Sequence, residues 1–209
     1  MQRLQDKIAL VTGASKGIGA ATAKQLAAAG ASVVVNFHTS ADSADQVVNK
    51  IIKSGGTAVA VKADVSNEDD IARLMFQIKE IYGRIDILVN NAGVYAFGPL
   101  EAITAASYHH EYDLNVLWLL LTTKTALHLF PADGGSIINI GSRVNSIAPA
   151  NSVISSASKA AVNAIKMVLA KELGPREIRV NSLNPGIIMT EGLYLAVWQT
   201  FRCESTMNP

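Results

Sequence analysis

A regular alternation of short apolar runs with longer segments of helical periodicity constrains the fold of this sequence most strongly. The short runs are rich in β-branched residues and almost wholly apolar, which is typical of strands buried on both faces of a sheet. Six such runs lie at residues 7–11, 32–36, 57–61, 86–90, 136–140 and 179–183. Helical periodicity fills the segments between them, over about 17–29, 41–54, 67–82, 101–130 and 152–173.

This alternation predicts the architecture. Strands that alternate with helices connect by right-handed crossovers into a parallel sheet with helices on both faces. The sequence therefore predicts an α/β fold, a doubly wound parallel sheet (Rossmann-like) of six strands flanked by helices. Such an architecture hosts many chemistries, so the function has to be argued from particular residues.

Composition excludes several classes of protein. A net charge of +1 over 209 residues gives no electrostatic footprint for nucleic acid or an anionic membrane. Cys203 is the single cysteine, which excludes an internal disulfide framework and fits a reducing compartment. The longest apolar run, 116–121, is too short to span a bilayer, and the amino terminus reaches a strand-like run too soon for a signal peptide. We expect a soluble, cytoplasmic protein.

A glycine-rich loop follows the first strand and opens the first helix. TGASKGIG places glycines at Gly13, Gly17 and Gly19. Glycine allows a tight turn there, and it lets backbone N–H groups approach a pyrophosphate at the helix N-terminus. The position of the loop between a buried strand and a helix therefore predicts a dinucleotide site.

This loop and the motifs after it closely resemble the short-chain dehydrogenase/reductase family of the classical type. NNAG at 90–93 resembles the family's motif at the end of the fourth strand. ADV at 63–65 is similar to its adenine-contacting turn, and NPG at 184–186 to its nicotinamide-side turn. The resemblance covers about residues 5–190 in the family's order, so we expect a single dinucleotide-binding catalytic domain over 1–190. It implies an NAD(P)-dependent oxidoreductase, similar in general look to 3-oxoacyl-carrier-protein reductases and to sugar or small-alcohol dehydrogenases.

The same resemblance implies the residues of the site. Those expected at the cofactor are Gly13, Ser15, Lys16, Gly17, Ile18, Gly19, Asn36, His38, Asp64, Val65, Asn91, Ala92, Gly93, Lys159, Pro185, Gly186, Ile188 and Thr190. The expected catalytic positions are Asn115, Ser142, Ser155 and Lys159. By the resemblance, the asparagine holds a water in a proton relay, the first serine positions the substrate oxygen, and the lysine binds the nicotinamide ribose.

Ser155 departs from the family pattern, which has a tyrosine four residues before the lysine. A phenol has a pKa of about 10, which a nearby cation can lower, and residues four apart share one helix face. An aliphatic hydroxyl is a much weaker acid and a shorter side chain. General acid–base catalysis contributes roughly 10²–10⁴-fold, so we expect an activity reduced by that order. The alternative is a catalytically inactive NADP(H)-binding pseudoenzyme or interaction scaffold.

The end of the second strand bears on the choice of cofactor. NAD-specific folds commonly place an acid there for the ribose 2′-OH, and residues 33–40 contain no Asp or Glu. Lys16 adds positive charge in the glycine loop, and Asn36 and His38 have groups that can donate to a 2′-phosphate. The sequence therefore favours NADP(H) over NAD(H).

The remaining expectations concern partners and the chain's end. We expect a small-molecule carbonyl or alcohol substrate and no metal, since the four histidines lack metal-ligand spacing. The resemblance implies a homodimer or homotetramer built on the helices around 105–130 and 152–173. After Thr190 the family usually adds a further helix and a last strand, whereas residues 191–209 form an atypical tail. Tyr194, in this tail, is a less favoured replacement for the missing phenol.

Overall fold

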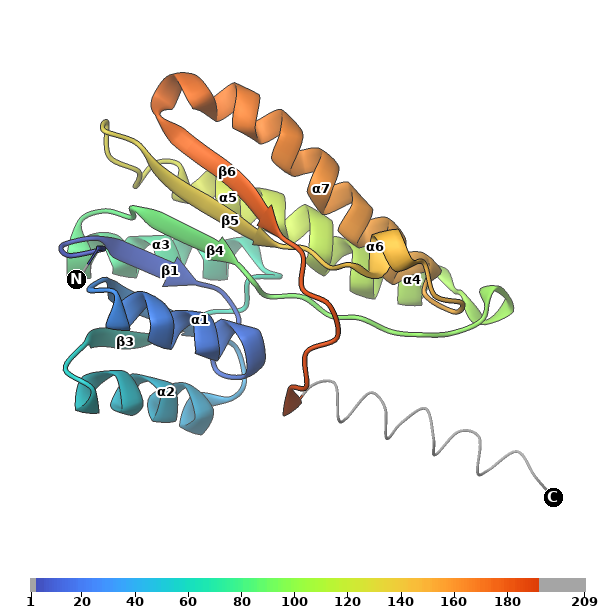
Figure 1. Ribbon diagram of the computed structural model, residues 1–209, viewed down its shortest axis with the longest axis horizontal. Coiled ribbons are helices and arrows are strands. Elements are labelled where there is room, and N and C mark those ends of the chain that lie inside the picture. The colour runs from blue at the N-terminus through green and yellow to red at the C-terminus, as the bar shows by residue number, and fades with distance from the viewer. Residues whose placement is uncertain (1–2, 192–209) are drawn as a thin grey trace.

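One parallel sheet organises residues 3–191, the part of the chain that the computed structural model describes (Figure 1). The strand order is β3-β2-β1-β4-β5-β6, and every neighbouring pair is parallel. The strands are β1 (Ile8–Val11), β2 (Ser32–Phe37), β3 (Thr57–Lys62), β4 (Ile87–Asn90), β5 (Gly135–Ile140) and β6 (Ile178–Leu183). The predicted doubly wound parallel sheet is confirmed.

Helices cover the sheet in two layers (Figure 1). On one face, α1 (Gly17–Ala28) and α2 (Ala41–Lys53) pack against apolar side chains of β1 and β2. On the other, α3 (Glu68–Tyr82) and α5 (Trp118–Ala126) pack against a second core, to which the end of α7 (Val153–Leu173) also contributes. The chain changes face between β3 and β4, so β1 and β4 lie side by side with their connections running in opposite directions. Ligands of such sheets bind outside the carboxyl ends of the strands at this point.

The segment predicted as one long helix over 101–130 is helical over 105–126 and contains a π-helical turn. A short turn η1 (Leu100–Ala102) precedes α4 (Ala105–Tyr112), a π-helical turn η2 (Asp113–Leu117) follows, and α5 ends at Ala126. Thr104 and Ser107 form a reciprocal capping box that starts α4. The predicted long helix is therefore confirmed over 105–126, but it begins later and ends earlier than predicted, because the capping box at Thr104 sets its start and α5 ends at Ala126.

Two short elements complete the described chain: α6 (Val144–Ile147) follows β5, and η3 (Gly174–Arg176) joins α7 to β6. By length and composition alone Val153–Arg176 is apolar enough to cross a membrane, but this is weak evidence, because α7 packs against β6 and α4. Residues 192–209, with Tyr194 and Cys203, lie outside the described residues, so the predicted domain boundary stays a prediction.

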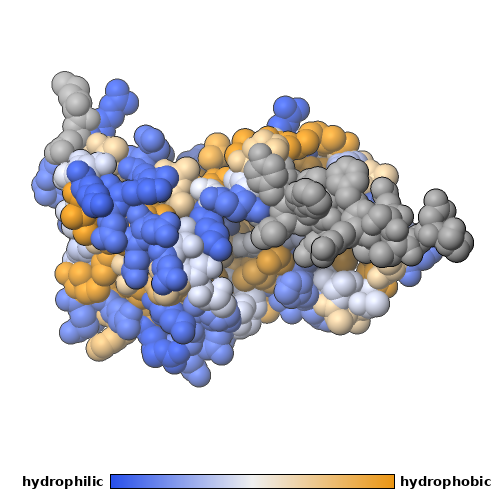
Figure 2. All heavy atoms as spheres, turned by 90° about the horizontal axis from the view of Figure 1, so that it is seen from below, coloured by the Kyte–Doolittle hydropathy of each residue, from blue (hydrophilic) through white to orange (hydrophobic). Residues whose placement is uncertain are grey.

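The surface is uneven in polarity. Figure 2 shows hydrophilic residues over much of the left half of one face and hydrophobic residues gathered toward the right half. Several large apolar side chains near the carboxyl ends of the strands are exposed, among them Phe97, Leu100, Ile187 and Met189. These exposed apolar side chains belong to the segments that border the pockets described next.

Candidate active site

The glycine loop leaves no room for side chains at two of its three glycines. Gly13 has a φ of 60°, and a Cβ there would lie 3.0 Å from the Cα of Ala92. At Gly19 a Cβ would lie 2.5 Å from the side-chain nitrogen of Asn91 and 2.6 Å from the Gly13 carbonyl oxygen. The loop is therefore a close-packed cradle of bare backbone at the start of α1, which fits a pyrophosphate-binding loop.

Residues after β4 brace this loop. The Thr12 hydroxyl accepts hydrogen bonds from the backbone N–H groups of Asn91 and Ala92, both at 3.0 Å. In return, the Asn91 side chain donates to the carbonyl oxygens of Thr12 (2.9 Å) and Gly13 (3.0 Å). The two motifs that the sequence singled out thus form one hydrogen-bonded unit between β1 and β4.

A pocket of about 480 Å³ lies next to this unit and gathers most of the predicted catalytic side chains. It takes Ser142 from the end of β5, and Ser155 and Lys159 from one face of α7. Other predicted residues that line it are Ile18, Asn91, Gly93, Pro185, Gly186, Ile188 and Thr190. Residues from both halves of the sheet therefore converge on one cavity.

Lys159 is a largely buried cation. Its Nζ donates a 3.0 Å hydrogen bond to the carbonyl oxygen of Ile140. Burial lowers the pKa of Lys159 to about 8, although the negative charge of Glu111 acts to raise it. Lys159 is therefore still protonated at neutral pH, but burial makes its charged form less favourable than it would be in water.

Asn115 lies behind the pocket, inside the π-helical turn. Its Oδ1 accepts from the Val94 N–H at 3.0 Å, and its Nδ2 donates to the Val94 carbonyl (2.9 Å) and to the Ser158 hydroxyl (3.1 Å). The residue is 1% exposed and is not among those that line the pocket. Its amide fastens the chain after Gly93 to α7, and π-helical turns often occur at such functional positions.

Glu111 is a site residue that sequence reasoning missed. It is only 2% exposed, and its carboxylate accepts hydrogen bonds from the Ser155 hydroxyl and, at 3.2 Å, from the Ala96 N–H. Burial raises the pKa of Glu111 against the opposing effects of Ser155, the Ala96 N–H and the charge of Lys159. The one signal in the sequence is its spacing: it stands four residues before Asn115, on the same side of the helix.

The predicted nucleotide-side residues lie apart from this pocket, around the ends of β2 and β3. Asn36 is 1% exposed and donates to the carbonyl oxygens of Val61 (3.4 Å) and Ala63 (3.0 Å). Its Oδ1 also accepts from the Gly13 N–H at 3.2 Å. The expectation that Asn36 donates to a phosphate is therefore corrected, since its amide hydrogens already bond the β3 backbone and the residue holds the glycine loop in place.

The other residues predicted at the ends of β2 and β3 are His38, Asp64 and Val65, and they differ in exposure. Val65 is 8% exposed and belongs to the apolar core. His38 is an exposed residue whose Nε2 lies 3.6 Å from the Asp64 carboxylate. In the glycine loop, Ser15 is half-buried, and Lys16 is exposed at the residue that precedes α1.

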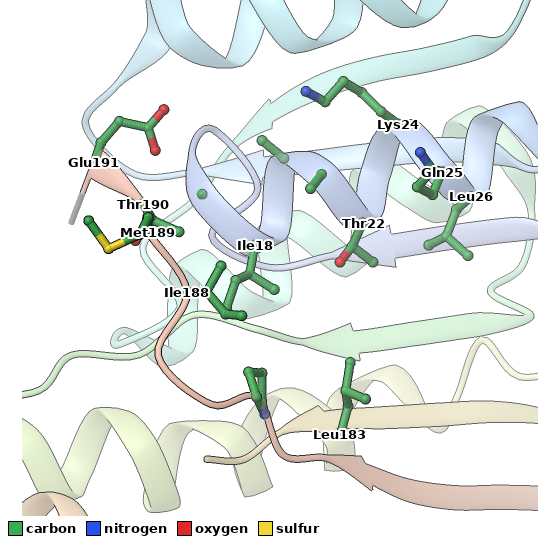
Figure 3. A pocket seen from close by; sticks show the side chains of 14 residues that line it. Ile18, Thr22, Lys24, Gln25, Leu26, Leu183, Ile188, Met189, Thr190 and Glu191 are labelled. Atoms are coloured by element: carbon green, nitrogen blue, oxygen red, sulfur yellow. The ribbon is translucent and has the colours of Figure 1, made fainter. Parts of the chain in front are cut away.

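The segment after β6 crosses from the catalytic pocket to the glycine loop. A second hollow, of about 930 Å³, lies between this segment and α1. Figure 3 shows residues of both elements that line it, among them Ile18 and Ile188. Ile18, Pro185, Ile188 and Thr190 line both hollows, and a Cβ at Gly17 would lie 3.4 Å from the Thr190 methyl group. The NPG turn and the residues after it thus separate two parts of one crevice at the carboxyl ends of the strands.

Metal chemistry finds no support in this geometry. Within residues 3–191 no three His, Cys, Asp or Glu side chains come close enough together to hold an ion.

Comparison with known proteins gives a consistent result. The profile of the short chain dehydrogenase family matches residues 7–194. An uncharacterized oxidoreductase of Methylorubrum extorquens is 50% identical over 197 residues, which are 94% of this chain and 79% of the relative. A 3-oxoacyl-[acyl-carrier-protein] reductase of Synechocystis is 41% identical over 91% of this chain and 78% of its own length.

A crystal structure of a short chain dehydrogenase from Burkholderia cenocepacia in complex with NADP superposes with a TM-score of 0.86 at 38% identity. The match covers 91% of this chain and 78% of that one. The glycine cradle, the site on α7 and these relatives agree, and the chain belongs to the short-chain dehydrogenase family of NAD(P)-dependent oxidoreductases.

Proposed function

We propose that this protein is an NADPH-dependent reductase that converts the carbonyl group of a small molecule into an alcohol, slowed because Ser155 occupies the acid position. The observation that carries the proposal is the single pocket in which Ser142, Ser155 and Lys159 meet beside the glycine cradle. When bound, the reduced nicotinamide supplies a hydride to the carbonyl carbon.

The chain's own residues orient and polarise the substrate. The Ser142 hydroxyl, which accepts from the Val144 N–H at 3.1 Å, is free to donate its hydrogen to the carbonyl oxygen. The ammonium group of Lys159 stabilises the negative charge that develops on that oxygen, and its own burial strengthens this interaction. Asn115 keeps the wall of the pocket in place through Val94 and Ser158.

Three observations favour NADP(H) over NAD(H). Residues 33–40 contain no Asp or Glu, so no carboxylate there repels a 2′-phosphate. Lys16 is exposed on the glycine loop. The similar Burkholderia dehydrogenase holds NADP. His38 adds an imidazole at the end of β2, although Asp64 competes for it.

The substrate class follows from the relatives and the pocket. Apolar side chains such as Val94, Phe97 and Ile187 line the cavity around the polar groups. Together with the likeness to a 3-oxoacyl-carrier-protein reductase, this favours small ketones and 3-oxoacyl thioesters.

Ser155 also supports a second candidate, a nucleotide-binding scaffold without turnover. Its hydroxyl bonds the Glu111 carboxylate and the Ala96 carbonyl instead of standing free in the cavity. In this alternative the glycine cradle binds NADP(H) for structural or regulatory reasons, and no carbonyl is reduced.

We further propose a cytoplasmic homodimer or homotetramer. Met167 and Val168 are more than half exposed on α7, and apolar side chains of this kind commonly form the centre of subunit interfaces. Light scattering and cross-linking test this assembly, and a monomer at all concentrations contradicts it.

The decisive experiment compares the unmodified chain with Ser155→Tyr and Ser155→Ala. We expect the tyrosine variant to oxidise NADPH about 10²–10⁴ times faster against a panel of ketones and 3-oxoacyl thioesters, since it restores a general acid. Fluorescence titration with NADPH serves as the control for cofactor binding. If all three chains bind NADPH and none turns over, the reductase proposal fails and the scaffold gains.

A further inference from the structure

Glu111 is the buried ionisable group that the proposed roles of Ser142 and Lys159 do not use. A carboxyl group at 2% exposure is costly unless it is paired or has a function. One of its two hydrogen-bond partners is the Ala96 N–H, and the other is the Ser155 hydroxyl, at the position where the proton donor is missing. The carboxylate thus lies directly behind the gap in the site.

Glu111 also connects two cavities. It lines the catalytic pocket together with Ser155 and Lys159, and it lines a separate hollow of about 160 Å³ with Ser107 and Asn151. A group placed between two cavities can give up a proton on one side and recover it from water on the other. Asn151, which lines this second hollow, provides a polar partner for water there.

We propose that Glu111 is the proton source of this pocket and that it acts through the Ser155 hydroxyl on the oxygen of the bound carbonyl. A hydroxyl both donates and accepts, so Ser155 passes its own hydrogen to the substrate oxygen while it takes the proton of Glu111. As the hydride reaches the carbonyl carbon, the C=O π electrons move to the oxygen, which gains the Ser155 proton. The products are the alcohol, the oxidised cofactor and ionised Glu111, which water reprotonates from the second cavity.

The surroundings are consistent with this role. Burial raises the pKa of Glu111, which is the direction that a carboxylic acid acting as a proton donor needs. The charged or titratable groups around it are Lys159 from α7, His110 beside it on α4, and Tyr95 and Arg143 on the pocket wall. Of these, Tyr95 lines the cavity and carries a phenol, so it is the competing proton donor.

The relay rests on the proposed reductase function, so two comparisons test the relay and the reductase function separately. Turnover by Ser155→Tyr tests the reductase alone, since a phenol supplies its own proton. Turnover by Glu111→Gln in the unmodified background tests the relay alone. The exposed Glu101 on η1 provides a matched control, Glu101→Gln, which we expect to turn over at the unmodified rate.

We expect Glu111→Gln and Ser155→Ala each to lower turnover by about 10²-fold, within the range for acid–base catalysis. The double variant loses no more than either single one, because the two groups act as a unit. The pH profile of the unmodified chain falls as pH rises through the pKa of Glu111, and this limb is absent in Glu111→Gln. In the Ser155→Tyr background the loss on Glu111→Gln is at least tenfold smaller.

A spectroscopic measurement on the free protein is independent of turnover. Infrared difference spectra of the unmodified chain and Glu111→Gln, taken during a pH titration, report the C=O stretch of a protonated carboxyl. The proposal requires this band to persist above the pH at which ordinary glutamates ionise. A band lost with the other glutamates, a Glu111→Gln variant that keeps the acid limb, or loss of that limb in Tyr95→Phe overturns it.

Discussion

Replacing Lys159 by methionine tests the electrostatic state of the pocket without substrate or cofactor. Methionine keeps the length and much of the packing of the side chain but removes its charge. The ordinary pKa is 10.5, and burial lowers the pKa of Lys159 to about 8. At about 1.4 kcal/mol per pH unit, this difference corresponds to about 3 kcal/mol between the two protonation states. Because Lys159 retains some exposed surface, we treat that value as an upper bound.

The sign follows from the direction of the change. A group whose folded-state pKa is lowered stabilises the fold above its unfolded pKa, and this stability is lost as pH falls through the folded value. The unmodified chain should therefore gain stability relative to Lys159→Met as pH rises from about 8 to 10.5. Below pH 8 the difference in the free energy of unfolding should be constant.

Denaturant unfolding of both chains at a series of pH values between 7 and 10.5 measures this difference. Lys171→Met, on an exposed residue of the same helix, controls for general effects of lost charge. If the stability of the unmodified chain relative to Lys159→Met does not change with pH, or falls as pH rises from about 8 to 10.5, the account of a desolvated, charged Lys159 is refuted.

Two further predictions concern the cofactor loop. Gly19→Ala should lower the free energy of unfolding by about 1–3 kcal/mol and abolish NADPH binding in fluorescence titrations, because its Cβ would lie 2.5 Å from the Asn91 amide. Gly174→Ala, which meets nothing within 4 Å, should fold and bind normally, and equal behaviour of the two variants contradicts the cradle. Lys16→Ala should weaken NADPH binding by about tenfold, or about 1.4 kcal/mol, and leave NADH binding nearly unchanged. An equal loss for both cofactors would mean that Lys16 does not contact the 2′-phosphate.

Much of the fold follows from local patterns in the sequence. All six strands begin and end within one residue of the predicted runs, because short runs rich in β-branched and apolar residues indicate strands well. Asn or Gly follows β4, β5 and β6 directly. The π-helical turn between α4 and α5 does not follow, since the apolar pattern continues through it. That turn depends on the side-chain bonds of Asn115 to Val94 and Ser158, which are distant in sequence.

The site was predictable to a similar extent. Family-like spacing identified Ser142, Ser155 and Lys159, and the structure brings all three to one pocket. Glu111 escaped notice because a glutamate among His and Tyr residues resembles a solvated helix face. Asn36 was assigned to the ligand because its position at the end of a strand gives no sign that its amide bonds the neighbouring β3 backbone.

The π-helical turn has a consequence for how this segment tolerates insertions and deletions. An α-helix advances about 100° per residue, so the extra residue in Asp113–Leu117 sets the angular phase between α4 and α5. Loss of one residue there would restore regular α-helix and rotate one half against the other by about that angle. If the Trp118 side still faced the core, Glu111 would no longer face Ser155. If Glu111 still faced Ser155, the Trp118 side would turn away from the core. The length of this turn is therefore as much a determinant of the active site as the identity of any side chain in it.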